Sequence, residues 1–251
     1  MTQISLQGKP IRLAVLDYGL FEVHSGPRRI GICGFAIQTD AGELVLIDTG
    51  FPAKYGVDAE AATAEDGLGS FGRVLKITAE NTPEAQLAKL GLSKSDVTLM
   101  IQSHSHIDHI GDLDGFPGLP ILIAKAERAL PRPLYWSGKQ PMAWPERDFH
   151  LVLEDVMLGP GFEVLLCPGH APGQLAFMVE LPETGWMLLT SDAISRAAEI
   201  DEGFAGSWNV PLAKHHGARL LRLARDRQAQ IIYGHCPQQW PGLRKAPDWF
   251  T

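Results

Sequence analysis

The sequence predicts an α/β fold, an αββα four-layer sandwich built as a single domain over residues 1–251. Two observations support this prediction: strand-like and helix-like segments alternate along the chain, and the strand-like segments gather in two groups. Two sheets that bury one face against each other, with helices on their outer faces, satisfy such an order. A composition of 45% hydrophobic and 20% charged residues is ordinary for a globular domain and supplies an ample core.

Strands dominate the first part of the chain. Apolar runs predict strands at Ile11–Leu16, Ile30–Gln38 and Glu43–Asp48, and the turn of residues 39–42 joins the last two as a hairpin. Residues 52–81 show no sustained hydrophobic period, which predicts a long loop. Because loops of that length in compact domains are usually functional, we expect this segment to act as a lid.

The rest of the chain alternates helices with strands. Thr82 can cap a helix, Pro83 suits its first position, and Gly91 ends it. Apolar residues at helical spacing predict a second helix at Lys214–Arg227. Further strands are predicted at Val97–Gln102, Pro120–Ala124, Phe162–Cys167, Leu175–Leu181, Trp186–Thr190 and Gln230–Tyr233.

Charge and cysteine content argue against several classes of partner. The net charge of −7 disfavours nucleic acid, whose affinity for proteins comes largely from Lys and Arg on phosphates, and it disfavours anionic lipid. No run of about 18 apolar residues could span a bilayer, and the first residues lack the apolar core of a signal peptide. The three cysteines form no CxxC pair, which is typical of a reduced protein. We therefore expect a cytoplasmic protein without nucleic-acid or membrane partners.

Histidines cluster directly after predicted strands. His104, His106 and His109 follow one strand, and His170 and His235 each follow another. His104 and His106 are two residues apart, so at an extended strand end both side chains project to one side. Imidazoles and carboxylates in an open arrangement are the ligands of a catalytic zinc ion. An HxH pair alone is a weak signal, whereas the full string HxHxDH after a strand predicts a metal site.

Four motifs in order resemble those of the metallo-β-lactamase superfamily. That superfamily carries HxHxDH, a later Pro-Gly-His, a strand ending in Asp, and a Gly-His close to the end of the chain. Here they are His104-Ser105-His106-Ile107-Asp108-His109, Pro168-Gly169-His170, Thr190-Ser191-Asp192 and Gly234-His235, and the upstream Ile47-Asp48-Thr49-Gly50 is similar to a further strand-end motif. The resemblance extends from about residue 30 to the end of the sequence.

The resemblance implies two Zn²⁺ ions per chain, with other divalent transition metals as alternatives. The implied ligands are His104, His106 and His170 for the first ion, Asp108, His109 and His235 for the second, and Asp192 as a bridge between the two. Asp48 is implied to orient the loop of residues 104–109, called the histidine loop below, without binding a metal. Two ions about 3.5–4 Å apart can share a hydroxide and lower its pKa to about 7, which gives a nucleophile without Ser or Cys. Asp108 could also pass on a proton, so Asp108 and Asp192 are the expected catalytic carboxylates.

Within the superfamily the chain looks most like the N-acyl homoserine lactonases, which are quorum-quenching and small-lactone hydrolases. Its length, the strand-ending Ser191-Asp192-Ala193 and the closing residues 243–250 are similar to that branch. The resemblance implies a small-molecule lactone or ester as substrate, and it leaves a homodimer open. Lactonases usually carry a tyrosine shortly after the bridging Asp, but Ser195 stands at that place here and is too short to reach the same point.

Several alternatives therefore stay open. Phe21, Phe51 and Phe71 could form an apolar wall for an acyl chain, or they could pack the lid onto the domain. Because Ser195 replaces the usual tyrosine, the substrate could instead be another ester, a thioester or an amide. A protein that binds metal without turnover is disfavoured because the implied ligand set is intact. Cys236 directly follows an implied ligand, and its role is open.

Overall fold

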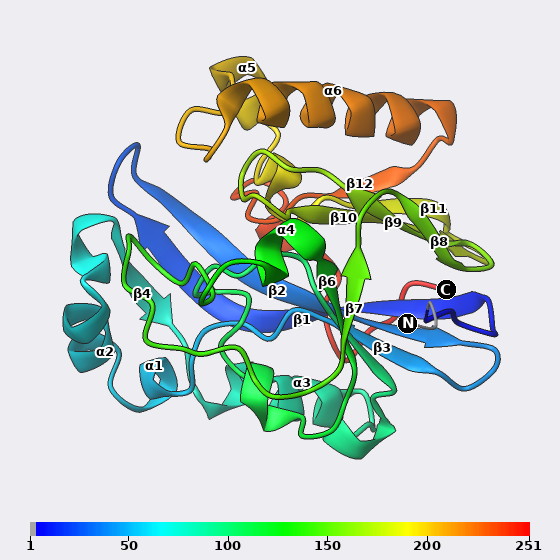
Figure 1. Ribbon diagram of the computed structural model, residues 1–251, viewed down its shortest axis with the longest axis horizontal. Helices are drawn as coiled ribbons and strands as arrows, with labels where there is room; N and C mark the ends of the chain where they lie inside the picture. The colour runs from blue at the N-terminus through cyan, green and yellow to red at the C-terminus, as the bar shows by residue number, and fades with distance from the viewer. Residues whose placement is uncertain (1–3) are drawn as a thin grey trace.

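The chain folds into four layers, as Figure 1 shows for residues 4–251, the part that this computed structural model describes. Helices α5 (Glu199–Glu202) and α6 (Val210–Asp226) cover the outer face of one sheet. Helices α1 (Lys54–Val57), α2 (Ala59–Asp66) and α3 (Pro83–Lys89) cover the outer face of the other. The predicted αββα sandwich is confirmed, and residues 1–3 of the predicted domain lie outside the described residues.

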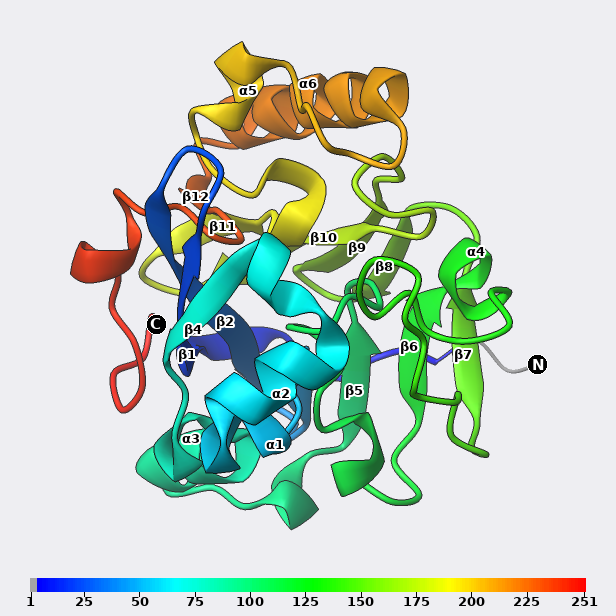
Figure 2. The ribbon, with the colours of Figure 1, turned by 90° about the vertical axis from the view of Figure 1, so that its left-hand side faces the viewer.

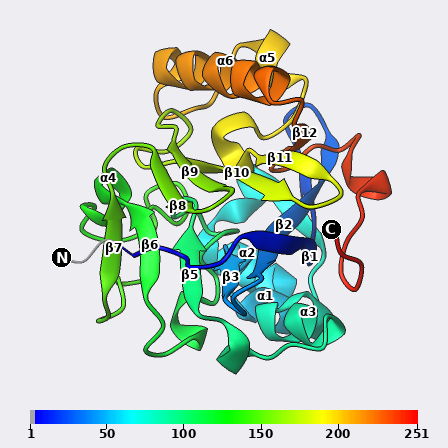
Figure 3. The same cartoon turned by 90° about the vertical axis from the view of Figure 1, so that its right-hand side faces the viewer.

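The two sheets stack face to face, which the side views in Figure 2 and Figure 3 make plain. The seven-stranded sheet has the order β4-β1-β2-β3-β5-β6-β7 and the five-stranded sheet the order β12-β11-β10-β9-β8. The strands of the first sheet are β1 (Pro10–Val23), β2 (Arg28–Thr39), β3 (Leu44–Ile47), β4 (Gly72–Lys76), β5 (Leu99–Gln102), β6 (Ile121–Ala124) and β7 (Phe149–Val152). Those of the second are β8 (Val156–Gly159), β9 (Phe162–Leu166), β10 (Leu175–Leu181), β11 (Gly185–Leu189) and β12 (Gln230–Ile232). No helix of residues 4–251 is long and apolar enough to cross a membrane.

Strand β10 shows why apolar runs predicted the strands well. Phe177 and Val179 pack into the core between the two sheets, whereas Ala176 and Met178 pack on the other face with Leu220 of α6. A strand that is covered on both faces carries a continuous apolar run instead of an alternating one. The observed bounds of the strands at the centre of both sheets therefore differ little from those expected.

The prediction of a loop at residues 52–81 is wrong. The segment forms α1, α2, a 3₁₀ turn and then β4, which pairs antiparallel with β1. The side chain of Asp58 caps α2 by accepting a hydrogen bond from Ala61 N at 2.9 Å, and Gly67 ends the helix with φ +67°. These helices are short and carry hardly any apolar stripe. The sequence therefore shows no hydrophobic period from which they could be predicted. Whether the segment moves as a lid stays a prediction.

Two edge strands and one short helix also escaped the sequence patterns. They are β7 at the edge of the first sheet, β8 at the edge of the second, and α4 (Lys125–Arg128) directly after β6. Each has only four residues, and Leu151 and Met157 are exposed on the two strands. Elements this short and this exposed lack the hydrophobic period on which sequence prediction depends.

Candidate metal centre

The residues that directly follow several strands of both sheets lie close together. Asp48 comes directly after β3, and His104 lies two residues after the end of β5. From the second sheet, the segments after β9, β11 and β12 carry His170, Asp192 and His235. Binding and catalytic residues commonly sit at such strand ends, where a rigid scaffold fixes short loops. With their neighbours in residues 104–109, these histidines and Asp192 form two groups of three side chains and a third, made of His104, His109 and Asp192, that overlaps both; within each group the candidate ligand atoms lie within 4.8 Å of one another.

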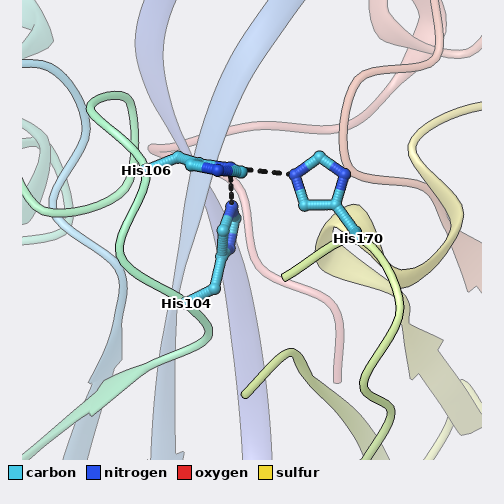
Figure 4. A group of neighbouring side chains, drawn as sticks. All are labelled: His104, His106 and His170. Atoms are coloured by element: carbon cyan, nitrogen blue, oxygen red, sulfur yellow. Dashed lines mark hydrogen bonds between the residues drawn. The ribbon is translucent and has the colours of Figure 1, made fainter. Parts of the chain in front are cut away.

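The first group is His104, His106 and His170, drawn in Figure 4. Nδ1 of His106 lies 3.0 Å from Nε2 of His104 and 2.9 Å from Nε2 of His170. One ring nitrogen carries at most one proton, so hydrogen bonds alone leave unpaired lone pairs at the centre of this group. Burial, followed by the charge of neighbouring imidazoles, lowers the pKa of His106 to about 3 and that of His104 well below its usual range. Neutral imidazoles that face one another in this way are suited to a cation.

The second group is Asp108, His109 and His235. Oδ2 of Asp108 lies 3.3 Å from Nε2 of His235 and 3.7 Å from Nε2 of His109. Burial lowers the pKa of both imidazoles, but nearby carboxylates outweigh it: Asp108 and Asp48 raise that of His109 to about 9. Asp192 and Asp108 raise the pKa of His235 to about 10. The carboxylates thus make this side of the site strongly attractive to positive charge.

Asp192 lies between the two groups. Its Oδ2 is 3.3 Å from Nε2 of His170, and its Oδ1 is 3.1 Å from Nε2 of His235 and 3.7 Å from Nε2 of His109. Burial raises the pKa of this carboxyl, but the charges of His235 and His170 hold it well below its usual range. One ionised side chain therefore contacts imidazoles of both groups.

Nε2 of His235 and Oδ1 of Asp192 lie 3.1 Å apart without forming a hydrogen bond, and these two atoms and Nε2 of His109 are buried with no hydrogen-bond partner among the described residues. Buried polar atoms are almost always paired, so unpaired ones need an explanation such as an ion. Imidazole nitrogen and carboxylate oxygen are ordinary zinc ligands, and three protein ligands with a place left open are typical of catalytic sites. The residues present therefore fit a divalent cation in each of the two groups.

Asp48 holds the histidine loop in place through hydrogen bonds. Its Oδ2 lies 2.8 Å from Nδ1 of His109 and accepts a hydrogen bond from Ser103 Oγ at 2.6 Å. Its Oδ1 accepts from Ser103 N at 2.8 Å and from Gln102 Nε2 at 2.9 Å. A carboxylate on one ring nitrogen leaves the other nitrogen free to face the site, which is how outer partners orient metal ligands.

Glu127 on α4 makes a comparable connection that the sequence patterns did not indicate. This fully buried carboxylate accepts hydrogen bonds from Ser105 N at 2.9 Å, from Ser105 Oγ, and from Gly173 N at 3.0 Å. Burial raises its pKa despite the bonds from Ser105. Ser105 lies between His104 and His106, and Gly173 lies three residues after His170. Glu127 thus ties together the two loops that carry the first group.

A cavity of about 340 Å³ opens onto this cluster. The four side chains expected to contact substrate, Phe21, Phe51, Phe71 and Ser195, all line it, together with Asp108 and Asp192. The rings of Phe21 and Phe71 stack with centroids 5.9 Å apart, and those of Phe21 and Phe51 with centroids 6.0 Å apart. Cys236 is buried and lies outside the residues that line this cavity.

Further lining residues carried no sequence motif. They are, among others, Trp136, Arg196, Glu199 and Ser207. Trp136 extends the aromatic wall, since its ring centroid lies 4.7 Å from that of Phe71. Glu199 and Arg196 lie with Ser195 in the segment that joins the second sheet to α6, and the Glu199 Oε2 accepts a hydrogen bond from Ser195 N at 2.7 Å. The cavity is therefore aromatic on one side and polar on the other.

The fold and this cluster together define a metal-dependent hydrolase. The sequence pattern of the metallo-beta-lactamase superfamily matches residues 34–235, and this chain belongs to that superfamily. An N-acyl homoserine lactonase of Bacillus thuringiensis is 30% identical over 224 residues, covering 86% of this chain and 85% of the relative. The lactonase AttM of Azorhizobium caulinodans is 31% identical over 181 residues, covering 66% and 68%. The resemblance to the lactonase branch is thereby confirmed.

Solved structures agree on the fold. B. thuringiensis AiiA with N-decanoyl-L-homoserine bound at its active site aligns with a TM-score of 0.83 at 24% identity, over 98% of this chain and 100% of that one. The dizinc quorum-quenching lactonase AidC, in complex with a hexanoyl-homoserine product, aligns with a TM-score of 0.65 at 20% identity, over 97% and 96%. Both are similar in fold along nearly the whole length of this chain.

We predict that Glu127→Gln weakens zinc binding by about 10–100-fold, because the amide no longer holds both loops of the first histidine group. Competition with a chelator of known affinity measures this change. Glu43→Gln is the matched control, since Glu43 likewise accepts two backbone N–H bonds and one hydroxyl bond, from Gln7, Gly8 and Thr39. Equal zinc affinity in the two variants would contradict the role given to Glu127.

Zinc binding should also release protons from the second group. Pairing with carboxylates raises the pKa of His109 to about 9 and that of His235 to about 10, so both are largely protonated at about pH 8. A metal ion takes only the neutral ring, so the number of protons released per chain falls as pH rises through these pKa values. Calorimetric zinc titrations in buffers of different ionisation enthalpy measure this difference. Release that does not change with pH would refute the arrangement of charges described above.

Proposed function

We propose that this protein opens the ring of an N-acyl homoserine lactone or a related small lactone, with two zinc ions held at the cluster. The position of Asp192 carries the proposal, because one carboxylate contacts imidazoles of both ligand groups. The lactonase relatives support the choice of substrate class. Other divalent transition metals could take the same places, since the ligands are imidazoles and carboxylates.

In this proposal the two groups hold one ion each. His104, His106 and His170 hold the first, Asp108, His109 and His235 hold the second, and Asp192 serves both. When bound, such a pair of ions supplies hydroxide at neutral pH and polarises the carbonyl of the substrate. Asp48 and Glu127 keep the rings in place through their bonds to His109 and to Ser105.

Asp108 is the proposed carrier of the proton. Its carboxylate lines the cavity, and its side chain keeps a partial exposure of 18% there. Water gives a proton to the Asp108 carboxylate and becomes hydroxide, the hydroxide adds to the ester carbonyl, and the ring C–O bond breaks. The departing alkoxide then takes the proton from Asp108, so that the product is a hydroxy acid and the site returns to its starting state.

The two walls of the cavity orient the substrate. The aromatic wall of Phe21, Phe51 and Phe71 suits an acyl chain, because rings of this kind bury apolar surface efficiently. The lactone ring then faces Asp108 and Asp192. The ring and the amide group of the substrate contact the polar wall, which includes Ser195, Arg196 and Glu199. Ser195 lies on that polar wall and lines the cavity.

A second candidate function follows from Ser195. The short hydroxyl leaves space where lactonases usually place a tyrosine, so a differently shaped acyl compound could lie there. Another ester, a thioester or an amide would meet the same metal ligands and the same proton carrier. The chemistry is unchanged in this alternative, and only the leaving group differs.

The test is a proton-release assay of the zinc-loaded protein against a panel of substrates. The panel holds N-acyl homoserine lactones of several chain lengths, γ-butyrolactone, an aromatic lactone, a β-lactam and a thioester. We expect kcat/KM to be highest for an acylated lactone and to fall by roughly 100-fold or more after chelation, because the ions stabilise the charge of the transition state. Turnover of the thioester or the β-lactam with no lactone opened would establish the second candidate instead.

A further inference from the structure

One buried carboxylate on α2 collects three hydrogen bonds behind the aromatic wall. Asp66 is only 3% exposed, and its Oδ2 accepts hydrogen bonds from the hydroxyls of Tyr55 and Tyr135, each at 2.8 Å. Its Oδ1 accepts from Nζ of Lys54 at 2.8 Å. A buried charge is tolerated when it is paired and fully hydrogen-bonded, and Asp66 meets both conditions.

The two tyrosines are permanent donors at this carboxylate. Burial, together with the hydrogen bond to Asp66, raises the pKa of both Tyr55 and Tyr135 above the ordinary range. Both hydroxyls therefore stay protonated wherever Asp66 is ionised. Tyr55 belongs to α1, so its bond stays within the segment of residues 52–81, whereas the bond from Tyr135 links that segment to a distant part of the chain.

Tyr135 is also fixed directly to the histidine loop. Its N–H donates to Ser105 O at 2.9 Å, and its carbonyl accepts from Ile107 N at 3.1 Å. These two bonds enclose His106, which pairs with Tyr135 as an isolated parallel bridge. The backbone of Tyr135 has φ +56°, a left-handed conformation that is rare for a large side chain and that persists only where surrounding contacts enforce it.

The residue after Tyr135 belongs to the wall of the cavity. Trp136 lines it and packs on Phe71, with ring centroids 4.7 Å apart. Phe71 in turn follows α2 in the chain by five residues. This part of the wall is therefore built from two segments far apart in sequence, and the hydrogen bond between Asp66 and Tyr135 is a direct polar connection between them.

We propose that Asp66 and Tyr135 are positioning residues that hold the aromatic wall and the histidine loop together as one unit. The part of this inference that concerns acyl chains rests on the proposed lactonase function, whereas the part that concerns the histidine loop does not. A substrate tail that packs against Trp136 and Phe71 then acts on the same element that orients His106. Binding of the acyl tail thereby helps to fix the position of His106 beside the lactone ring. Binding energy from the tail can in this way raise kcat. The segment of residues 52–81 is anchored at Asp66 instead of moving freely there.

Tyr55→Phe and Tyr135→Phe form a matched pair that tests the proposal. Each removes one hydroxyl from the same carboxylate oxygen and keeps the ring, but only Tyr135→Phe removes the hydrogen bond between α2 and the residue whose backbone is bonded to the histidine loop. The first measurement is Zn²⁺ affinity by chelator competition. We expect Tyr135→Phe to weaken it by about 10-fold or more, a loss in the range found for outer partners of metal ligands, and Tyr55→Phe to keep the wild-type value.

The second measurement is the ratio of kcat/KM between a long-chain and a short-chain N-acyl homoserine lactone. Tyr135→Phe should lower this ratio, and Tyr55→Phe should leave it unchanged. Thermal unfolding should show a similar loss of stability in both, because the chemical deletion is the same. Asp66→Asn, which keeps the shape of the side chain, should behave as Tyr135→Phe does and guards against a misfolded variant.

The outcomes separate this inference from the proposed function. If wild-type protein opens no lactone but Tyr135→Phe alone weakens Zn²⁺ binding, the positioning role stands and the lactonase proposal falls. If Tyr55→Phe and Tyr135→Phe change Zn²⁺ affinity and the chain-length ratio equally, the carboxylate only stabilises the fold and the inference is overturned. Unchanged values in Tyr135→Phe and Asp66→Asn overturn it as well.

Discussion

The contact of one carboxylate, Asp192, with two imidazole groups is the interaction on which the rest of this structure depends. Each group joins two residues that follow β5 of the first sheet to one histidine that follows a strand of the second, so the site exists only if the sandwich holds the two sheets in place. Unpaired nitrogen and oxygen atoms buried at their meeting point would be costly on their own, and a cation removes that cost. Asp48 and Glu127 show how the fold meets this demand, since each fixes a ligand loop with several hydrogen bonds at once.

Sequence reasoning predicted the metal-binding half of the molecule far better than the substrate half. HxHxDH is a local string at the end of an apolar strand, and the resemblance to the superfamily joined it to the distant His170, Asp192 and His235. Glu127, Asp66 and Trp136 carry no such signal, because their importance arises from contacts with residues that are distant in the chain. The helices of residues 52–81 were missed for a related reason: they are short, and their stability comes from Asp58 capping and from the buried Asp66 instead of an apolar stripe.

The two halves of the cavity have different physical origins. The candidate metal ligands match the pattern of a whole superfamily. They are imidazoles and carboxylates because these groups bind zinc. The walls are an aromatic side from several segments that are distant in sequence, and a polar side with Ser195, Arg196 and Glu199. In the proposed function Ser195 affects how the leaving group is held, and the proposed anchoring of the aromatic side by Asp66 affects how the tail is held. In the proposed function these walls select the substrate, and the cluster that they enclose carries out the hydrolysis.

The number of metal ions per chain tests the central claim most directly. Elemental analysis of the purified, zinc-reconstituted protein should give two zinc ions per chain, because two ligand groups share Asp192. Removal of that shared carboxylate in Asp192→Ala should lower the count toward one, while the fold is retained. A count of one in the unaltered protein, or two equally tight ions in Asp192→Ala, would contradict the account.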